Sequence, residues 1–530
     1  MTTTWVIIFV MTGVLYRLYL TSVLPVGYDE VKVMAVGLEE MTESVGKTLI
    51  EVPVRRSNGI TPLWWWFEYA LTGNGRAISL LTLRVAPVVL GVLTLIVGYR
   101  LCSICWGRPT AVIFTAWLAL SDVLTFTNSR SDFSESLSVL LLIPVVCLIG
   151  RPGAVVVRGL CLLGLLMTGL GKGIFAVSLM VLAEGTVLLV RRFSTPKCAS
   201  MIEMRRALTP ASPGPVRSLM VSLVIAAVPT GVYLFAAASY FAPTDSIDHD
   251  AVEAEGMIDL VYQITFNYPE TKAHVTGGPM DAAFIWLNFD AWPVPLLSVP
   301  VIAIAIFLTV RKWWAGGIGG YSRRDTAMIG LLVWALCGAV LLISRGTAGA
   351  RFHLMYLPAL WLFAAHALRS RLDRVPTAVM GSVILGVWTV SVFFAGPVIW
   401  ASFARFEPMY ATEELKQLQS WRANGDPKPP PHGRTLNIDL AHHYLTTDPR
   451  SELDLDRAIR YARQETRNVP NAARGWFYLG EALHARGARI DDACAAWRRG
   501  LTLHANSGVE RKVLEHCAGE VHGPARNRAG

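Results

Sequence analysis

Apolar runs of about 20 residues recur along the first 400 positions of the chain, separated by polar segments. A helix needs about 20 apolar residues to cross the hydrocarbon core of a bilayer, where its backbone must satisfy its own hydrogen bonds. Residues 1–400 are therefore predicted to form an all-α polytopic membrane domain with about eleven transmembrane helices. The predicted spans are 4–25, 81–101, 109–127, 133–150, 154–170, 173–190, 218–238, 291–310, 326–344, 353–368 and 377–398.

The last 130 residues follow a different pattern, because they are rich in Arg, Glu, Asp and Ala and contain no apolar run long enough to span a bilayer. Residues 401–431 are predicted to be a linker, stiffened by the prolines of 426–431. Residues 432–518 are predicted to form a small α-helical repeat domain, and residues 519–530 a disordered tail.

The pattern of 432–518 is that of degenerate tetratricopeptide repeats. In the clearest unit, the residues that fit the first helix are Trp476, Leu479, Gly480 and Leu483, and those that fit the second are Ala493 and Trp497. About two units are visible, whereas a stable solenoid needs about three. The repeat domain is therefore predicted to pack on the membrane domain or on a protein partner.

The overall composition agrees with a membrane protein: 53% of the residues are hydrophobic and the mean hydropathy is +0.43. The formal net charge of +9 does not indicate nucleic acid, because many of the cations occupy short loops between apolar spans, where they set topology. With eleven spans, these cations fall on one side: Arg100, Arg108, Arg151, Arg191, Arg192, Lys197, Arg205, Arg206, Arg217, Arg311, Lys312, Arg323, Arg324, Arg369, Arg371 and Arg374.

The side rich in Arg and Lys is cytoplasmic by the positive-inside rule. The N-terminus is then cytoplasmic and the C-terminal domain extracytoplasmic, as in a protein of a bacterial inner membrane. Two long outer segments result, 26–80 and 239–290. The first is predicted to contain interfacial helices, with an aromatic belt at headgroup depth formed by residues 64–69.

Both outer segments carry acidic residues at the mouth of the predicted bundle. Asp29 and Glu30 follow the first span, and the second segment contains His249 and Asp250 in an acidic stretch. A carboxylate at this place suits proton transfer on a lipid-borne substrate, and partial burial would raise its pKa from about 4. Asp29 is the candidate general base. Glu30 is a metal ligand, a positioning group or a residue without a role.

The order of several short segments resembles the GT-C glycosyltransferases that use polyprenyl-phosphate sugars, such as the protein O-mannosyltransferases and the lipid A aminoarabinose transferase. The resemblance covers about 400 residues. It is carried by Asp29-Glu30, Asn58–Trp64, Leu83-Arg84-Val85-Ala86-Pro87, Asn128-Ser129-Arg130-Ser131-Asp132, Leu170-Gly171-Lys172-Gly173 and Ala350–Ala359. Where the family has His-Pro-Pro, this chain has Ile60-Thr61-Pro62, so the His is absent.

The resemblance implies transfer of a sugar from a lipid phosphate with inversion at the anomeric carbon. The leaving phosphate needs positive charge. Lys172, Arg130 and Arg351 are the candidates, because all three lie at predicted outer ends of spans. Each is alternatively an anchor that fixes helix depth, and Asp132 is placed to neutralise Arg130. Lys172 is expected to have no other charge nearby.

Cofactor and partner predictions follow from the same residues. His249 and Asp250 either hold a divalent cation or belong to a solvated loop, so metal dependence stays open. The chain shows no glycine-rich dinucleotide fingerprint or P-loop, which favours a polyprenyl-phosphate-linked sugar over a nucleotide sugar as donor. The acceptor is a glycan, a lipid or a protein, and the tetratricopeptide-like domain is a candidate site for a protein partner.

Two other functions compete with the transferase. A transporter or flippase of lipid-linked sugars would show internal symmetry between halves, and no clear repeat of the membrane half is visible. An inactive scaffold in envelope assembly would use the repeat domain as its working part. Cys494 and Cys517 lie in that domain and can pair in an oxidising compartment, although their spacing alone cannot show it.

Overall fold

The computed structural model divides the chain into two compact units, which are described separately. The membrane unit comprises residues 1–24 and 37–415, and the tail unit residues 25–36 and 416–530. The residues whose structure is described are 2–23, 34–35, 37–38, 41, 52, 62–74, 78–130, 134–194, 214–237, 303–304, 306–307, 309–311, 322–344, 353–371, 375–376, 378–386, 388–389, 436–447, 451–468, 470, 473–503 and 506–517.

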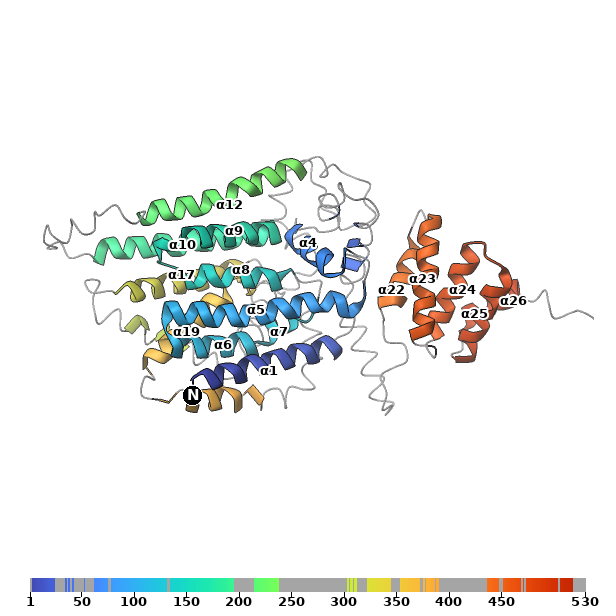
Figure 1. Cartoon of the computed structure of the whole chain (residues 1–530), viewed down its shortest axis with the longest axis horizontal. Coiled ribbons are helices and arrows are strands. Elements are labelled where there is room, and N and C mark those ends of the chain that lie inside the picture. The colour runs from blue at the N-terminus through green and yellow to red at the C-terminus, as the bar shows by residue number, and fades with distance from the viewer. Residues whose placement is uncertain are drawn as a thin grey trace, which may run out of the picture. The chain divides into compact units, whose positions relative to one another are not determined.

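Every regular element among these residues is helical, which confirms the predicted all-α class. Five helices are long and apolar enough to cross a membrane. They are α1 (Thr2–Val23), α5 (Leu80–Trp106), α10 (Leu170–Ser194), α12 (Pro215–Ala237) and α17 (Arg323–Ser344). These helices correspond to predicted spans and run along nearly the same direction in Figure 1. The described part of the chain is therefore that of a polytopic membrane protein.

Shorter helices complete the membrane unit. They are α4 (Pro62–Leu71), α6 (Arg108–Leu120), α7 (Asp122–Thr127), α8 (Glu135–Cys147), the 3-10 turn η2 (Pro152–Ala154), α9 (Val155–Thr168) and α19 (Leu357–Arg371). The predicted span 109–127 is broken, because the Ser121 hydroxyl accepts a hydrogen bond from the Leu124 amide at 3.3 Å and caps a new helix, α7. Residues 291–302 and 390–398 of the predicted spans lie outside the described residues.

The core of the membrane unit forms around α6. Every residue of α6 from Thr110 to Leu120 is buried, and the helix packs against α1, α5 and α19. α12 is instead peripheral and leaves apolar side chains such as Phe235 uncovered, 82% exposed. A helix apolar on its outer face suits contact with lipid, because hydrocarbon imposes no penalty on that surface.

The tail unit is a run of five described helices: α22 (Leu436–Thr446), α23 (Glu452–Asn468), α24 (Ala473–Ala485), α25 (Ile490–Leu503) and α26 (Ser507–His516). Each packs against the next one along the chain. The two helices predicted from Trp476 and Trp497 are α24 and α25. Trp497 is fully buried and its indole lies directly over Gly480, where a side chain would collide with it.

A disulfide joins Cys494 on α25 to Cys517, the residue that follows α26. The sequence left this pairing open. In the structure the bond fastens the last described helix of the tail unit to the preceding one. The described cysteines of the membrane unit are free: Cys102, Cys105, Cys147, Cys161 and Cys337.

Replacing Cys494 and Cys517 together by Ser is expected to lower the free energy of unfolding of the tail unit by about 3 kcal/mol. The bond closes a loop with a sequence separation of 23 residues, and its loss returns that conformational entropy to the unfolded chain. Hydrogen exchange of the α25 and α26 amides in the full-length protein measures the change. Cys337→Ser in the membrane unit should leave that exchange unchanged. Equal protection of the two helices with and without the bond would contradict the expectation.

Candidate functional site

Lys172 lies at the centre of a polar cluster near the first turn of α10. Its Nζ forms an ion pair with Oε1 of Glu135 at 2.7 Å and donates a hydrogen bond to Oγ of Ser134 at 2.9 Å. The side chain of Glu135 is 2% exposed, whereas that of Lys172 is 22% exposed. The side chain of Lys172 is therefore the more accessible member of this pair. The expectation of no other charge near Lys172 is wrong, because Glu135 contacts it.

The chain places these groups through two local features. α9 and α10 meet at Gly169 and approach so closely that a side chain at Gly173 would come within 2.5 Å of the Leu166 Cα. This close packing fixes Lys172 at the start of α10. Glu135 occupies the first turn of α8, where the unsatisfied amides of a helix favour negative charge.

Arg130 belongs to the short segment between α7 and α8, four residues before Ser134. It is 1% exposed, and its guanidinium carbon lies 5.7 Å from the centre of the Phe126 ring. The neighbouring Ser129 donates from its hydroxyl to the carbonyls of Thr125 at 2.7 Å and Arg17 at 3.2 Å. These bonds tie the segment to α1 as well as to α7.

Two further arginines of this region hold the helices together. Arg17 is fully buried and donates to the carbonyls of Leu118 at 3.1 Å and Ala119 at 3.2 Å. Those carbonyls lie at the end of α6, where the break at Ser121 removes their helical partners. Arg84 of α5 donates to the Thr21 carbonyl at 2.9 Å. Arg17 and Arg84 therefore have structural tasks, which the sequence analysis did not assign to either residue.

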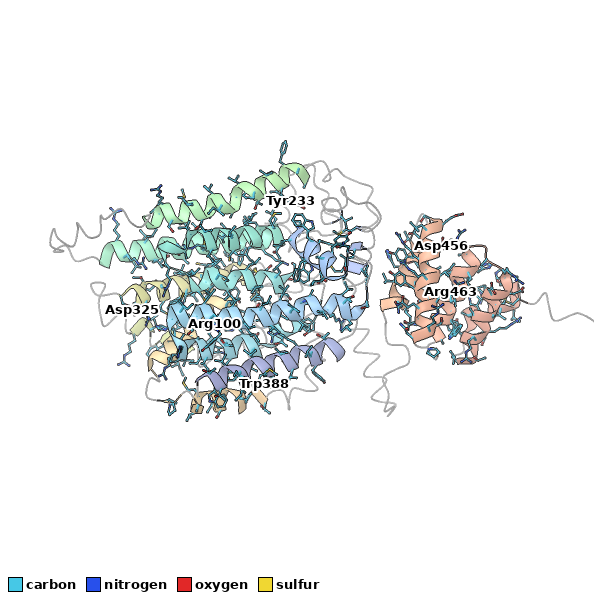
Figure 2. The ribbon with its side chains drawn as sticks, in the orientation of Figure 1. Arg100, Tyr233, Asp325, Trp388, Asp456 and Arg463 are labelled. Carbon is cyan, nitrogen blue, oxygen red and sulfur yellow. A yellow bond between two sulfur atoms is a disulfide. The ribbon has the colours of Figure 1, made fainter. Side chains whose placement is uncertain are left out.

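α4 lies at the end of the bundle that contains the C-terminus of α1 and the start of α5 (Figure 1). It buries Glu68 together with Trp64 and Trp65. Trp66 makes an edge contact with Tyr233 of α12, with ring centres 6.1 Å apart, at the place where Figure 2 labels Tyr233. The predicted aromatic belt is therefore corrected: Trp64 and Trp65 are covered by protein and do not face lipid headgroups.

The described residues hold only part of the predicted site. Of its described members, Lys172 contacts Ser134, and Arg130 lies four residues before Ser134 in the sequence. Asp29, Glu30, Asp132, His249, Asp250 and Arg351 lie outside the described residues. Within the described ranges there is no group of three or more His, Cys, Asp or Glu side chains placed to hold a metal ion. The divalent cation considered for His249 and Asp250 stays a prediction.

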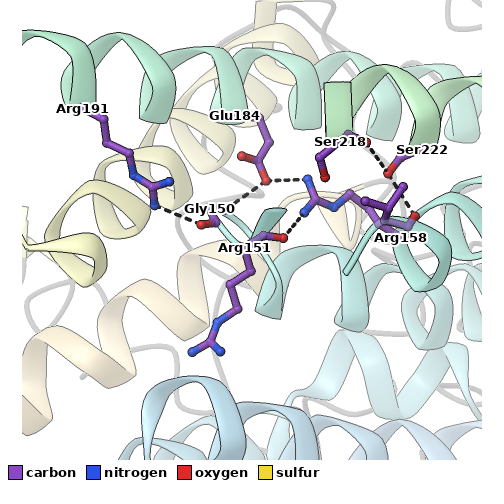
Figure 3. A network of polar contacts seen from close by, with 8 residues as sticks. Gly150, Arg151, Arg158, Glu184, Arg191, Ser218 and Ser222 are labelled. Carbon is purple, nitrogen blue, oxygen red and sulfur yellow. Dashed lines mark hydrogen bonds and ion pairs between the residues drawn. The ribbon is translucent and has the colours of Figure 1, made fainter. Parts of the chain in front are cut away.

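A second polar cluster occupies the opposite end of α8, α9 and α10 (Figure 3). Arg158 forms an ion pair with Glu184 at 2.8 Å, and Oε1 of Glu184 also accepts from the Gly150 amide at 3.0 Å. Nη2 of Arg158 donates to the Arg151 carbonyl at 2.7 Å, and Arg191 donates to the Gly150 carbonyl at 3.0 Å. Because these contacts close the turn between α8 and α9, the cluster fixes how three helices pack.

Burial distinguishes this second cluster from the first. The side chains of Arg158 and Glu184 are 3% and 9% exposed, so the pair offers little surface to a ligand. Glu184 lies inside the predicted span 173–190, and an acid within a membrane span needs a partner. That rule could have indicated from the sequence that Glu184 has a cationic partner, but it does not identify the partner as Arg158.

Glu184→Ala is expected to destabilise the membrane unit by about 3–5 kcal/mol, because it leaves the Arg158 charge buried without its carboxylate. The midpoint of thermal unfolding in detergent measures the loss. Arg158→Met combined with Glu184→Met removes both charges and is expected to recover most of the stability. A single variant as stable as the parent would show that the ion pair does not contribute.

Comparisons with known proteins give a distant likeness at the level of solved structures. No protein-family model matches the chain, and no curated protein sequence matches it. Among solved structures, the chain is similar to the crystal structure of ArnT from Cupriavidus metallidurans bound to undecaprenyl phosphate. The two share 14% sequence identity over 93% of this chain and 79% of that chain, with a TM-score of 0.48.

Proposed function

We propose that the protein is an integral membrane glycosyltransferase that moves a sugar from a polyprenyl-phosphate donor to an acceptor on the outer side of the membrane. The observation that supports this most is the partly exposed side chain of Lys172, whose ammonium is held by Glu135 and Ser134 between membrane helices. A fixed cation in such a place stabilises the negative charge that collects on a departing phosphate. The order of the GT-C-like sequence segments supports the same reaction.

The proposed reaction is a single inverting displacement. The acceptor oxygen attacks the anomeric carbon of the sugar, and its proton passes to the Asp29 carboxylate. The bond between the anomeric carbon and the phosphate oxygen breaks, and its electron pair leaves with the polyprenyl phosphate. Lys172 binds that phosphate, with Arg351 as a further cationic group. Arg130, which is 1% exposed, adds positive charge from inside the fold rather than a direct contact. Glu30 and Asp132 position their neighbours.

The contacts of Lys172 support the proposed role. A lysine on a flexible stem loses side-chain entropy when it binds an anion. Glu135 and Ser134 already hold the ammonium in place, so less of that entropy remains to be lost when the phosphate arrives. The carboxylate of Glu135 also balances the charge while the site is empty, because an uncompensated cation among membrane helices is costly.

The disulfide of the tail unit supports the proposed orientation. Disulfides persist in oxidising compartments and are rare in the cytosol, so the bond between Cys494 and Cys517 fits an extracytoplasmic tail. The N-terminus is then cytoplasmic, in agreement with the loop charges, and the membrane is a bacterial inner membrane. The acceptor is a glycan, a lipid or a protein. The tail unit is proposed to be tetratricopeptide-like and to bind a protein partner.

Deletion of the gene tests the proposed function. Mass spectrometry of envelope glycans, lipids and proteins from the deletion strain should show one sugar missing, and the wild-type gene on a plasmid should restore it. The unused polyprenyl-phosphate sugar should accumulate on the outer leaflet, where a transferase would consume it. Accumulation on the inner leaflet would instead identify a transporter of the lipid-linked sugar, and an unchanged envelope would contradict both enzyme and transporter.

A further inference from the structure

The tail unit contains a groove that the proposed transfer reaction does not use. Its volume is about 770 Å³, and it lies along α23 from Asp456 to Asn468, with further lining from α24 and the turn that follows. Three arginines line it: Arg460, Arg463 and Arg467. All three are exposed. Figure 2 labels Arg463 and Asp456, both on α23.

The three arginines share one face of the helix because they are three and four residues apart. At a rise of about 1.5 Å per residue, Arg460 and Arg467 are about 10 Å apart along the helix axis. The groove therefore presents a row of guanidinium groups rather than a single cation. Gln464 and Asn468 lie in the same groove and add amide groups that both donate and accept hydrogen bonds.

This positive charge is not neutralised by the acidic residue of the groove. Among the residues that line it, the carboxylate is that of Asp456, and it already accepts a hydrogen bond from Nε of Arg486 at 2.8 Å. That hydrogen bond and the charge of Asp456 raise the pKa of Arg486 above its ordinary value. Within the described part of the tail unit, no ion pair involves Arg463 or Arg467.

Helix stability does not account for the whole row. Cations in the last turn of a helix interact favourably with its macrodipole, and the effect fades beyond that turn. Arg467 lies in the last turn of α23, so the macrodipole explains its charge. Arg463 lies one turn earlier, and its exposed guanidinium is available to a ligand.

We propose that this groove binds an acidic polypeptide segment in an extended conformation. In such a segment alternate side chains point to the same side, about 6.7 Å apart. Successive arginines rise by about 4.5 Å and about 6 Å along the helix axis, and their long, flexible side chains span the difference. Each carboxylate can pair with a guanidinium fork, while Gln464 and Asn468 hydrogen-bond the peptide backbone. The proposal concerns the tail unit alone, so it does not depend on the transfer reaction.

Binding of a defined peptide to the purified full-length protein tests the proposal. The probe is a fluorescein-labelled synthetic heptapeptide in which Glu alternates with Ser, and its counterpart carries Gln at each Glu position. Fluorescence anisotropy should show saturable binding of the Glu peptide that weakens with added salt. Arg463→Gln and Arg467→Gln should each weaken binding about five- to tenfold, because each removes charge-assisted hydrogen bonds.

The control is Arg499→Gln, which removes the same charge from an exposed position on α25 and should leave binding unchanged. Thermal unfolding of each variant should match that of the parent. The proposal is overturned if the Gln peptide binds as well as the Glu peptide, or if the combined Arg463→Gln and Arg467→Gln variant binds as well as the parent. It is also overturned if vesicles with 30% anionic phospholipid bind through these arginines and the peptide does not.

Discussion

Lys172→Met is expected to reduce sugar transfer by about 10²- to 10³-fold, the loss found when one group that stabilises transition-state charge is removed. The ammonium of Lys172 is held at 2.7 Å from Glu135 and at 2.9 Å from Ser134, so its position is fixed before the phosphate arrives. Met keeps the length and the apolar stem but has no charge. The loss is measured by complementing a deletion strain with the variant gene. The amount of the missing glycan that is restored is divided by the amount of the chain in the membranes.

A purely structural role for the same ion pair predicts a different pattern. Lys172→Met alone leaves the buried Glu135 carboxylate without its partner, which destabilises the fold whatever the function. Lys172→Met combined with Glu135→Gln removes both charges and should restore thermal stability in detergent. Transfer should stay lost in this double variant. Recovery of transfer together with stability would show that Lys172 serves only to balance Glu135.

Asp29→Asn is expected to reduce transfer by about 10²- to 10⁴-fold, because Asn cannot accept the acceptor proton. The substitution keeps the shape of the side chain, so insertion into the membrane and the amount of the chain should not change. Glu30→Gln, which neutralises the adjacent carboxylate, should cause a smaller loss. The same complementation assay measures both variants.

Undiminished transfer by the Asp29→Asn variant would reject Asp29 as the base. A loss of similar size in Glu30→Gln would instead indicate that the two carboxylates act as a unit, as coupled groups do. Both readouts require that the variant chains reach the membrane in parental amounts. Immunodetection of the chain in isolated membranes supplies that check.

Hydrophobic pattern predicted much of the helical architecture. The predicted spans 81–101, 173–190 and 326–344 correspond to α5, α10 and α17, because an apolar run of that length has few structural alternatives in a membrane. The break at Ser121 was missed, since hydropathy averaged over about 19 residues does not register a single capping residue. Ser followed by Asp is nevertheless a typical start of a helix.

The polar contacts were harder to predict than the helices. Lys172 was identified from its place at the end of a span, but its partner Glu135 belongs to another helix, and only the packing of α9 against both α8 and α10 brings the two together. The same holds for Arg158 and Glu184, which the sequence analysis did not select. Pairing of charges across helices depends on tertiary packing, which hydropathy does not encode. The positions of Asp29 and Arg351 remain predictions from the sequence.

Binding of polyprenyl phosphate to the purified full-length protein tests the central claim most directly, because this lipid is the group that the proposed reaction releases. Native mass spectrometry or a titration in detergent should show one saturable site in the parent. The variant that combines Lys172→Met with Glu135→Gln should bind about tenfold more weakly or worse, in keeping with the loss of a charge-assisted hydrogen bond. Equal affinity of the parent and this stable double variant would contradict the assignment of Lys172 to the donor phosphate.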